Sequence, residues 1–144
     1  MVGRAPDGDL VPDVRPLLAV PIAAGGLPAI RSRVEAIARD CGLSAERASD
    51  WVTAVNELMA NAVRHGGGTG DLRVWVDGQL NCEVRDNGPG FVAEPYVERR
   101  ERPVPSSDGG MGLWIAREMS DRMEIVSGRS GTVVRISTRM DGGA

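Results

Sequence analysis

The sequence predicts an α+β fold, a two-layer sandwich in which helices cover one face of an antiparallel sheet. Two observations predict it. Strand pairs joined by short turns are expected over residues 72–84 and 124–138, and helical segments precede each pair. Hairpins with helices to one side form a two-layer sandwich, whereas regular alternation of strand and helix would indicate a parallel sheet. The 144 residues are enough for one domain with its own core.

The N-terminal part predicts an arm followed by a strand. Residues 1–16 carry three prolines among charged residues and glycines. Such a composition predicts a flexible arm. Residues 17–22 predict the first strand, and Pro21 favours an edge position because proline donates no hydrogen bond to a neighbouring strand. We therefore expect a single domain over residues 17–140.

Two helices are expected before the first hairpin. The first opens around Pro28 and ends before Gly42, because glycine is common just after a helix. Its apolar face consists of Ile30, Val34, Ile37 and Cys41. The second is capped by Ser44 and runs to about His65. Its apolar stripe consists of Trp51, Val55, Leu58, Met59 and Ala62.

The second half of the chain predicts two hairpins separated by a loop and a helix. The dipeptide Asp-Gly at residues 77–78 is a strong turn signal between two alternating strands. Residues 92–108 are polar and contain prolines, so we expect them to be mobile. A helix is expected over residues 113–123. The four expected strands are residues 72–76, 80–84, 124–127 and 132–138.

The composition excludes several classes of protein. All 17 basic residues are arginine. The absence of lysine excludes a Walker A loop, the protein-kinase signature with its strand lysine, and Schiff-base chemistry. A single histidine excludes a zinc site built from several histidines. The net charge of −3 argues against a nucleic-acid partner, because such proteins usually carry a basic stripe.

The sequence also predicts a cytoplasmic protein with no membrane partner. Residues 1–10 lack the apolar core of a signal peptide, and the longest apolar stretch, residues 17–24, is too short to span a bilayer. The two cysteines, Cys41 and Cys82, form no metal or redox motif. We expect both to be buried thiols in a reducing compartment.

Three polar side chains of the second helix fall together on the face away from its apolar stripe. They are Glu57, Asn61 and Arg64. This pattern fits a solvated helix face. It also fits a cleft in which an asparagine oxygen binds Mg²⁺, a glutamate deprotonates a nucleophile and an arginine holds a phosphate. The helix alone leaves both interpretations open.

Two glycine-rich segments and one histidine add to these candidates. Residues 86–90, Asp-Asn-Gly-Pro-Gly, fit a turn, or a site where a ligand approaches the backbone and Asp86 accepts a hydrogen bond from an amine such as that of adenine. Residues 109–112, Gly-Gly-Met-Gly, form either a hinge or a phosphate site at a helix N-terminus. His65 lies near a helix C-terminus, where histidine is electrostatically favoured.

These groups resemble, in their order, the three nucleotide-binding boxes of GHKL ATP-binding domains, the family of gyrase, histidine kinases and MutL-type proteins. Residues 57–61 match the first box, residues 86–90 the second, and residues 110–113, Gly-Met-Gly-Leu, the third. Residues 56–65, Asn-Glu-Leu-Met-Ala-Asn-Ala-Val-Arg-His, look more specifically like the anti-sigma-factor serine/threonine kinases. The resemblance covers about residues 15–140.

The resemblance implies a Bergerat fold, with a mixed, mostly antiparallel sheet, helices on one face, and ATP held between the helices and a lid at residues 92–108. It implies that Glu57 is the general base, that Asn61 holds Mg²⁺ and that Asp86 bonds the adenine amino group. Arg64 would face the phosphates, and Thr132 would help to hold adenine. The other residues implied in nucleotide binding are His65, Gly88, Gly90, Gly109, Gly110, Gly112 and Leu113.

For activity, the resemblance implies a cytoplasmic, ATP- and Mg²⁺-dependent serine/threonine kinase. It would phosphorylate an antagonist protein, bind a sigma factor and form a homodimer. Two alternatives stay open: a non-catalytic module that sequesters a partner when nucleotide binds, and a detached histidine-kinase catalytic domain. The intact Glu57 favours the serine/threonine kinase, because nucleotide binding alone does not need a base there.

Overall fold

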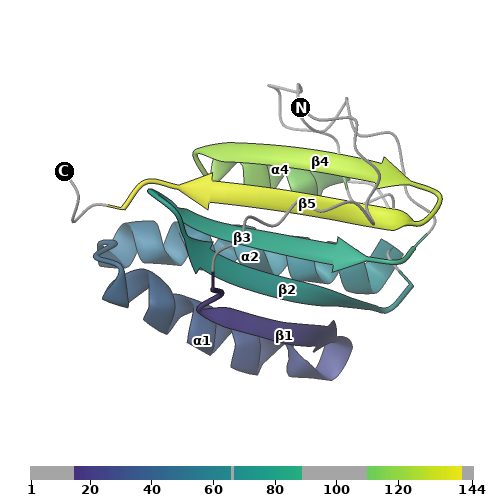
Figure 1. Ribbon diagram of the computed structural model, residues 1–144, viewed down its shortest axis with the longest axis horizontal. Coiled ribbons are helices and arrows are strands. Elements are labelled where there is room, and N and C mark those ends of the chain that lie inside the picture. Colours follow the sequence, from purple (N-terminus) through teal and green to yellow (C-terminus); the bar gives the residue numbers. More distant parts are fainter. Residues whose placement is uncertain (1–14, 66, 89–109, 141–144) are drawn as a thin grey trace.

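The computed structural model describes residues 15–65, 67–88 and 110–140, and within them the predicted α+β sandwich is confirmed. In these ranges three helices cover one face of a five-stranded sheet (Figure 1). The strands are β1 (Leu18–Ala23), β2 (Thr69–Val76), β3 (Leu80–Asp86), β4 (Arg122–Gly128) and β5 (Gly131–Thr138). The helices are α1 (Leu27–Asp40), α2 (Ala45–His65) and α4 (Gly110–Glu118), with a 3₁₀ turn, η1 (Ala24–Gly26), before α1.

The strand order in the sheet is β1-β2-β3-β5-β4, and every neighbouring pair in the described residues is antiparallel. The mixed sheet implied by the resemblance is therefore not found there. β3 and β4 run in the same direction, but β5 lies between them and pairs with both. β1 forms an edge of the sheet, as Pro21 predicts.

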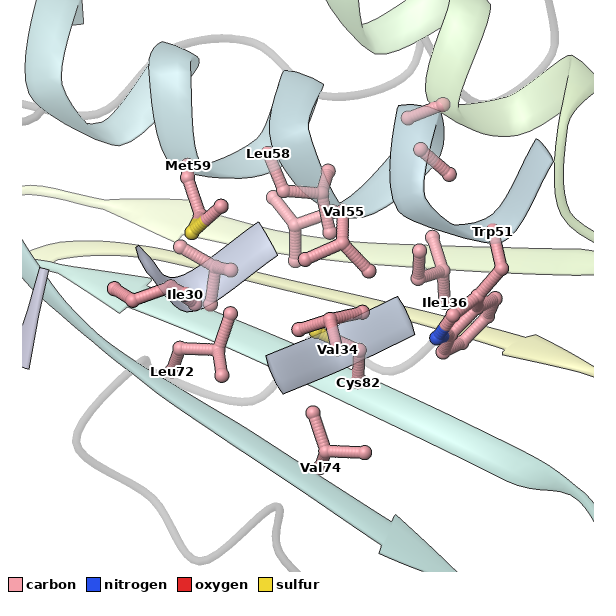
Figure 2. Close-up of a cluster of buried hydrophobic side chains, with 14 of the residues drawn as sticks. Ile30, Val34, Trp51, Val55, Leu58, Met59, Leu72, Val74, Cys82 and Ile136 are labelled. Atoms are coloured by element: carbon pink, nitrogen blue, oxygen red, sulfur yellow. The ribbon is translucent and has the colours of Figure 1, made fainter. Parts of the chain in front are cut away.

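α2 covers the inner face of the sheet. Its first turn is capped as predicted, because the Ser44 hydroxyl oxygen accepts a hydrogen bond from the Arg47 backbone N–H at 3.1 Å. The predicted apolar stripe is also confirmed, since all five of its side chains are buried. Those that Figure 2 labels, namely Trp51, Val55, Leu58 and Met59, point toward the strands.

α1 packs against α2 and differs in part from the predicted apolar face. Ile30 and Val34 are buried as predicted, together with Ala38. Ile37 and Cys41 are only half-buried, so the prediction of a buried thiol at Cys41 is wrong. The buried residues are spaced four apart, which places them on one ridge of the helix. Ile37 and Cys41 lie beside that ridge.

α4 also differs from its predicted boundaries. It begins at Gly110, inside the glycine cluster, and ends at Glu118, earlier than predicted. The Ser120 hydroxyl donates a hydrogen bond to the Ala116 carbonyl oxygen at 2.8 Å. The Ser120 N–H itself bonds the Arg117 carbonyl oxygen at 3.4 Å, three residues back, so the four-residue helical pattern is no longer followed there. β4 begins at Arg122 instead.

Several predictions concern residues outside the described ranges. Most of the predicted arm, the predicted lid at residues 92–108, Gly90 and Gly109 lie there. Within the ranges, Cys82 is a buried free thiol, as predicted. No helix in the described part of the chain is long and apolar enough to cross a membrane.

The packing predicts a clear difference between two leucines. Leu58 is 1% exposed, whereas Leu17 is 53% exposed. Leu58→Ala is expected to lower the free energy of unfolding by about 2–5 kcal/mol, because it leaves a cavity between α2 and the sheet. Leu17→Ala is the control, with an expected change within about 0.5 kcal/mol. Urea unfolding measures both, and equal losses would contradict this packing.

Candidate functional site

A row of polar and glycine residues crosses one end of the inner face of the sheet. Its members, each opposite the next in the strand register, are Gly70, Asp86, Thr132 and Ser127. We call it the polar row. Side chains alternate along a strand, so the row shares its face with core residues such as Val84. The inner face is therefore apolar along most of its length and polar at this end.

Asp86 is the centre of the polar row and is 6% exposed. Its carboxylate accepts hydrogen bonds from the backbone N–H groups of Gly88, at 2.9 Å, and of Thr132. Burial raises the pKa of the Asp86 carboxyl above its usual value, and the two N–H groups offset part of that increase. Because a carboxylate has about four acceptor positions, Asp86 can accept a further N–H from a ligand.

Two glycines let the neighbouring strands approach the end of β3 closely. A Cβ atom on Gly70 would lie 2.6 Å from the Arg85 carbonyl oxygen. A Cβ atom on Gly131, whose φ is +133°, would meet the carbonyl oxygen of Asp86. Side chains at either position would push β2 or β5 away from Asp86.

Ser127 is a member of the row that sequence analysis did not single out. Its Oγ lies 2.7 Å from the Thr132 Oγ1, at hydrogen-bond distance. Thr132 itself is 2% exposed and lies opposite Asp86 in the register of β3 and β5. The signal that could have found Ser127 is the short turn between β4 and β5, which places residues 127 and 132 opposite each other.

The polar face of α2 meets α4 rather than open solvent. A Cβ atom on Gly112 would lie 2.7 Å from the Glu57 Oε1, so the missing side chain lets this carboxylate lie against the first turn of α4. Asn61, one turn further along α2, is buried. The alternative of a solvated face is therefore wrong for Asn61, whereas Glu57 is half-buried and Arg64 is exposed.

The same end of α2 lies over the polar row. A Cβ atom on Gly70 would come within 3.6 Å of the Ala62 Cβ, which places the last turns of α2 above the row. Asn61 precedes Ala62 in this turn. The structure thus brings the residues predicted from three separate stretches of sequence to one end of the domain.

Glu57 has an altered acidity. Partial burial raises the pKa of its carboxyl above the usual value, and the positive charge of Arg64 offsets part of that increase. Because the folded state raises this pKa, protonation of Glu57 stabilises the fold. The free energy of unfolding is therefore expected to rise as pH falls through the raised pKa. A raised pKa also makes the carboxylate a better proton acceptor.

Three buried side-chain nitrogen atoms have no hydrogen-bond partner within the described residues. They are Trp51 Nε1 and His65 Nε2 on α2 and Trp114 Nε1 on α4. Buried polar groups are normally paired with protein or water. The unpaired His65 nitrogen fits the prediction that this residue borders a ligand.

Leu113 and Gly110 both lie at the start of α4. The Leu113 side chain is part of the hydrophobic core, at 1% exposed, so it fixes α4 against α2 and only its backbone can face a ligand. Gly110 is the first residue of α4, where backbone N–H groups lack helical partners. Gly88 is buried beside Asp86.

The site has few ligands for a metal ion. In the described residues no group of three or more His, Cys, Asp or Glu side chains could hold one. The side-chain oxygens of Asn61 and Glu57 are hard ligands of the kind that Mg²⁺ takes. A magnesium ion here would need further oxygen ligands from water or from a bound phosphate.

One protein-family model matches most of this chain. The model of a family described as histidine kinase-like ATPase domain matches residues 20–138. No curated protein matches the chain.

Among solved structures, the RsbU and RsbW domains of Rv1364c from Mycobacterium tuberculosis share 20% identity and a TM-score of 0.61, over 87% of this chain and 33% of that chain. The histidine kinase domain of the blue-light activated histidine kinase of Erythrobacter litoralis EL346 shares 21% identity and a TM-score of 0.53, over 81% and 64%. This chain therefore spans a third of the first structure and less than two thirds of the second. At these identities the likeness shows the shared fold alone.

The close approach of α4 to Glu57 predicts an energetic coupling. In the Glu57→Ala background, Gly112→Ala is expected to raise the free energy of unfolding, because alanine favours the helix. With Glu57 present, the new methyl group must displace the carboxylate. Because this carboxylate ends a flexible, half-buried side chain that can move aside, the double-mutant cycle should show a coupling of only about 0.5 kcal/mol. Urea unfolding of the wild type, both single variants and the double variant measures this coupling. Gly25→Ala is the control, because a Cβ atom there meets nothing within 4 Å. Strictly additive changes in the free energy of unfolding would refute the contact.

The charge of Arg64 predicts the direction of a titration shift. In Arg64→Gln the pKa of the Glu57 carboxyl is expected to be higher than in the wild type, because the positive charge that lowers it is gone. Carboxyl-detected NMR titration measures this value. Arg33→Gln, at an exposed position of α1, is the matched control. A pKa of Glu57 that falls or stays the same in Arg64→Gln would contradict the described electrostatics.

Proposed function

We propose that this chain, which belongs to the histidine kinase-like ATPase domain family, is an ATP-dependent protein serine/threonine kinase. The family match spans most of the chain and confirms the GHKL membership predicted from the three boxes. ATP binding and kinase-like activity follow from the family at a coarse level. The acceptor residue and the partners are our inference.

The observation that carries the proposal is the position and acidity of Glu57. Its carboxylate lies against the first turn of α4, beside Gly112, and burial raises its pKa. A general base for a serine or threonine hydroxyl needs a carboxylate that accepts a proton readily and is held near the phosphate-binding glycines. Glu57 satisfies both conditions. Binding of nucleotide alone would require neither.

The other residues of the site fit a bound nucleotide. Asp86 is an acceptor for the adenine amino group, and the buried, unpaired His65 Nε2 gives the ligand a polar contact. The N-terminus of α4 offers unpaired backbone N–H groups to the phosphates, and the exposed Arg64 guanidinium adds positive charge. Asn61 would hold Mg²⁺, which when bound neutralises phosphate charge.

For the partners, the proposal follows the sequence of residues 56–65. Their resemblance to the anti-sigma-factor kinases supports a sigma factor as one partner and an antagonist protein, carrying the acceptor serine or threonine, as the other. One similar structure comprises the RsbU and RsbW domains of Rv1364c. We also propose a homodimer acting in the cytoplasm, without a nucleic-acid or membrane partner.

The role of Glu57 is tested by phosphotransfer with radiolabelled ATP, Mg²⁺ and candidate antagonist proteins. Glu57→Gln is expected to lower the rate by at least about 100-fold, because the proton acceptor is lost, while ATP affinity stays within about twofold. Burial disfavours the charged form, so the neutral glutamine is not expected to destabilise the fold at neutral pH. Glu46→Gln, exposed in the first turn of α2, is the control and should transfer phosphate normally.

The chemistry of the labelled product separates the alternatives. Phosphoserine and phosphothreonine survive acid, and such a product supports the proposal. An acid-labile phosphoprotein would favour a detached histidine-kinase domain. Tight capture of a partner with no label on any protein would favour the sequestering module. Equal rates for the wild type and Glu57→Gln would reject Glu57 as the base.

A further inference from the structure

We propose that Asp121 is a positioning residue that anchors the C-terminal end of α4 and so holds Gly112 against the Glu57 carboxylate. The inference rests on the role proposed above for Glu57 in phosphotransfer and names a residue that acts through it. Asp121 lies in the turn between α4 and β4 and belongs to none of the predicted nucleotide-binding boxes.

Asp121 joins α2 and β5 through one carboxylate oxygen. Its Oδ2 accepts hydrogen bonds from the Arg139 backbone N–H at 2.8 Å and from the Thr138 hydroxyl at 3.2 Å. The Arg47 Nη2, in the first turn of α2, lies 3.6 Å from this oxygen and donates to the Thr138 Oγ1 at 2.6 Å. We call these four residues the clasp. Thr138 pairs with Leu80 at the start of β3, so the clasp and the polar row lie at opposite ends of the sheet.

The clasp is charged at neutral pH. Partial burial raises the pKa of Asp121, but the hydrogen bonds from Arg139 and Thr138 outweigh this effect, so the net pKa lies below its usual value. An ionised acceptor makes shorter and stronger hydrogen bonds than a neutral one. The contacts of Asp121 therefore have a defined geometry.

α4 runs from the clasp to Glu57. Its last residue is Glu118, three positions before Asp121, and its first turn carries Gly112. Gly112 lies against Glu57, whereas Asp121 contacts Arg47 near the start of α2, so α4 is antiparallel to α2. A helix of nine residues is about 14 Å long. An anchor at one end of this short helix thus restrains the other end.

Apolar packing alone would leave the position of α4 along α2 poorly defined. Leu113 and Ala116 are the buried side chains of α4, and the hydrophobic effect is non-directional. Loss of the clasp is therefore expected to let the first turn of α4 move away from Glu57. The carboxylate would then meet more water, and its pKa would fall, because burial is what raises it.

The test uses three variants of the full chain that open the clasp with different changes of charge. Asp121→Asn removes a negative charge, Arg47→Gln removes a positive charge, and Thr138→Val changes no charge and keeps the shape of the side chain. Carboxyl-detected NMR titration of the folded proteins is expected to give a lower pKa of Glu57 in all three. Charge effects alone predict a lower value in Asp121→Asn, a higher one in Arg47→Gln and no change in Thr138→Val.

Asp50→Asn, at an exposed position of α2, removes a negative charge without touching the clasp. It should lower the pKa of Glu57 less than Asp121→Asn does. Opposite changes in Asp121→Asn and Arg47→Gln, or an unchanged value in Thr138→Val, would overturn the positioning role. Thr138→Val keeps the proposal testable where a charge variant does not fold.

The pH dependence of phosphotransfer links the clasp to the reaction. The acid side of the pH–rate profile should move to lower pH in Thr138→Val, because Glu57 must be ionised to accept a proton. A profile that stays in place while the pKa of Glu57 falls would overturn this link. Absence of phosphotransfer in the wild type would instead overturn the proposed function, and the NMR titration would still decide whether the clasp positions α4.

Discussion

The domain depends on α2 burying two opposite faces at once. Its apolar stripe, with Trp51 and Leu58, packs onto the sheet, while the face that carries Glu57 and Asn61 packs toward α4. A helix of 21 residues reaches along the whole inner face and ends above the polar row, where Ala62 meets Gly70. Burial of the stripe, a hydrophobic effect, thus fixes the position of the polar residues. The site is a consequence of the packing.

Much of this could be predicted because the signals are local. The helical period identified the buried stripe of α2, and the capping hydroxyl of Ser44 marked its start. Pro21 placed β1 at an edge, and the Asp-Gly turn fixed the first hairpin. The three boxes singled out Glu57, Asn61 and Asp86 as candidates, because a motif is defined by residue type and spacing, which the sequence shows directly. The family match agrees with the GHKL membership that these boxes predicted.

The remaining features depend on contacts between distant stretches. Ser127 joins the polar row through the pairing of β4 with β5, and the short turn between these strands is its one signal in the sequence. The Leu113 side chain belongs to the core, because the turn of α4 after Gly112 faces α2, which a glycine motif does not specify. α4 ends at Glu118, before the backbone N–H of Ser120 bonds three residues back to Arg117. The all-antiparallel pairing follows from β5 lying between β3 and β4.

The central claim is that the polar row, with Asp86 at its centre, holds adenine. Calorimetric titration of MgATP into the wild type and Asp86→Asn tests it most directly, with Asp71→Asn, at an exposed position of β2, as the control. The account predicts that Asp86→Asn weakens binding by at least about tenfold, because a donor replaces one acceptor oxygen, while the control binds normally. Equal affinity in the wild type and Asp86→Asn, with both proteins folded, would contradict it.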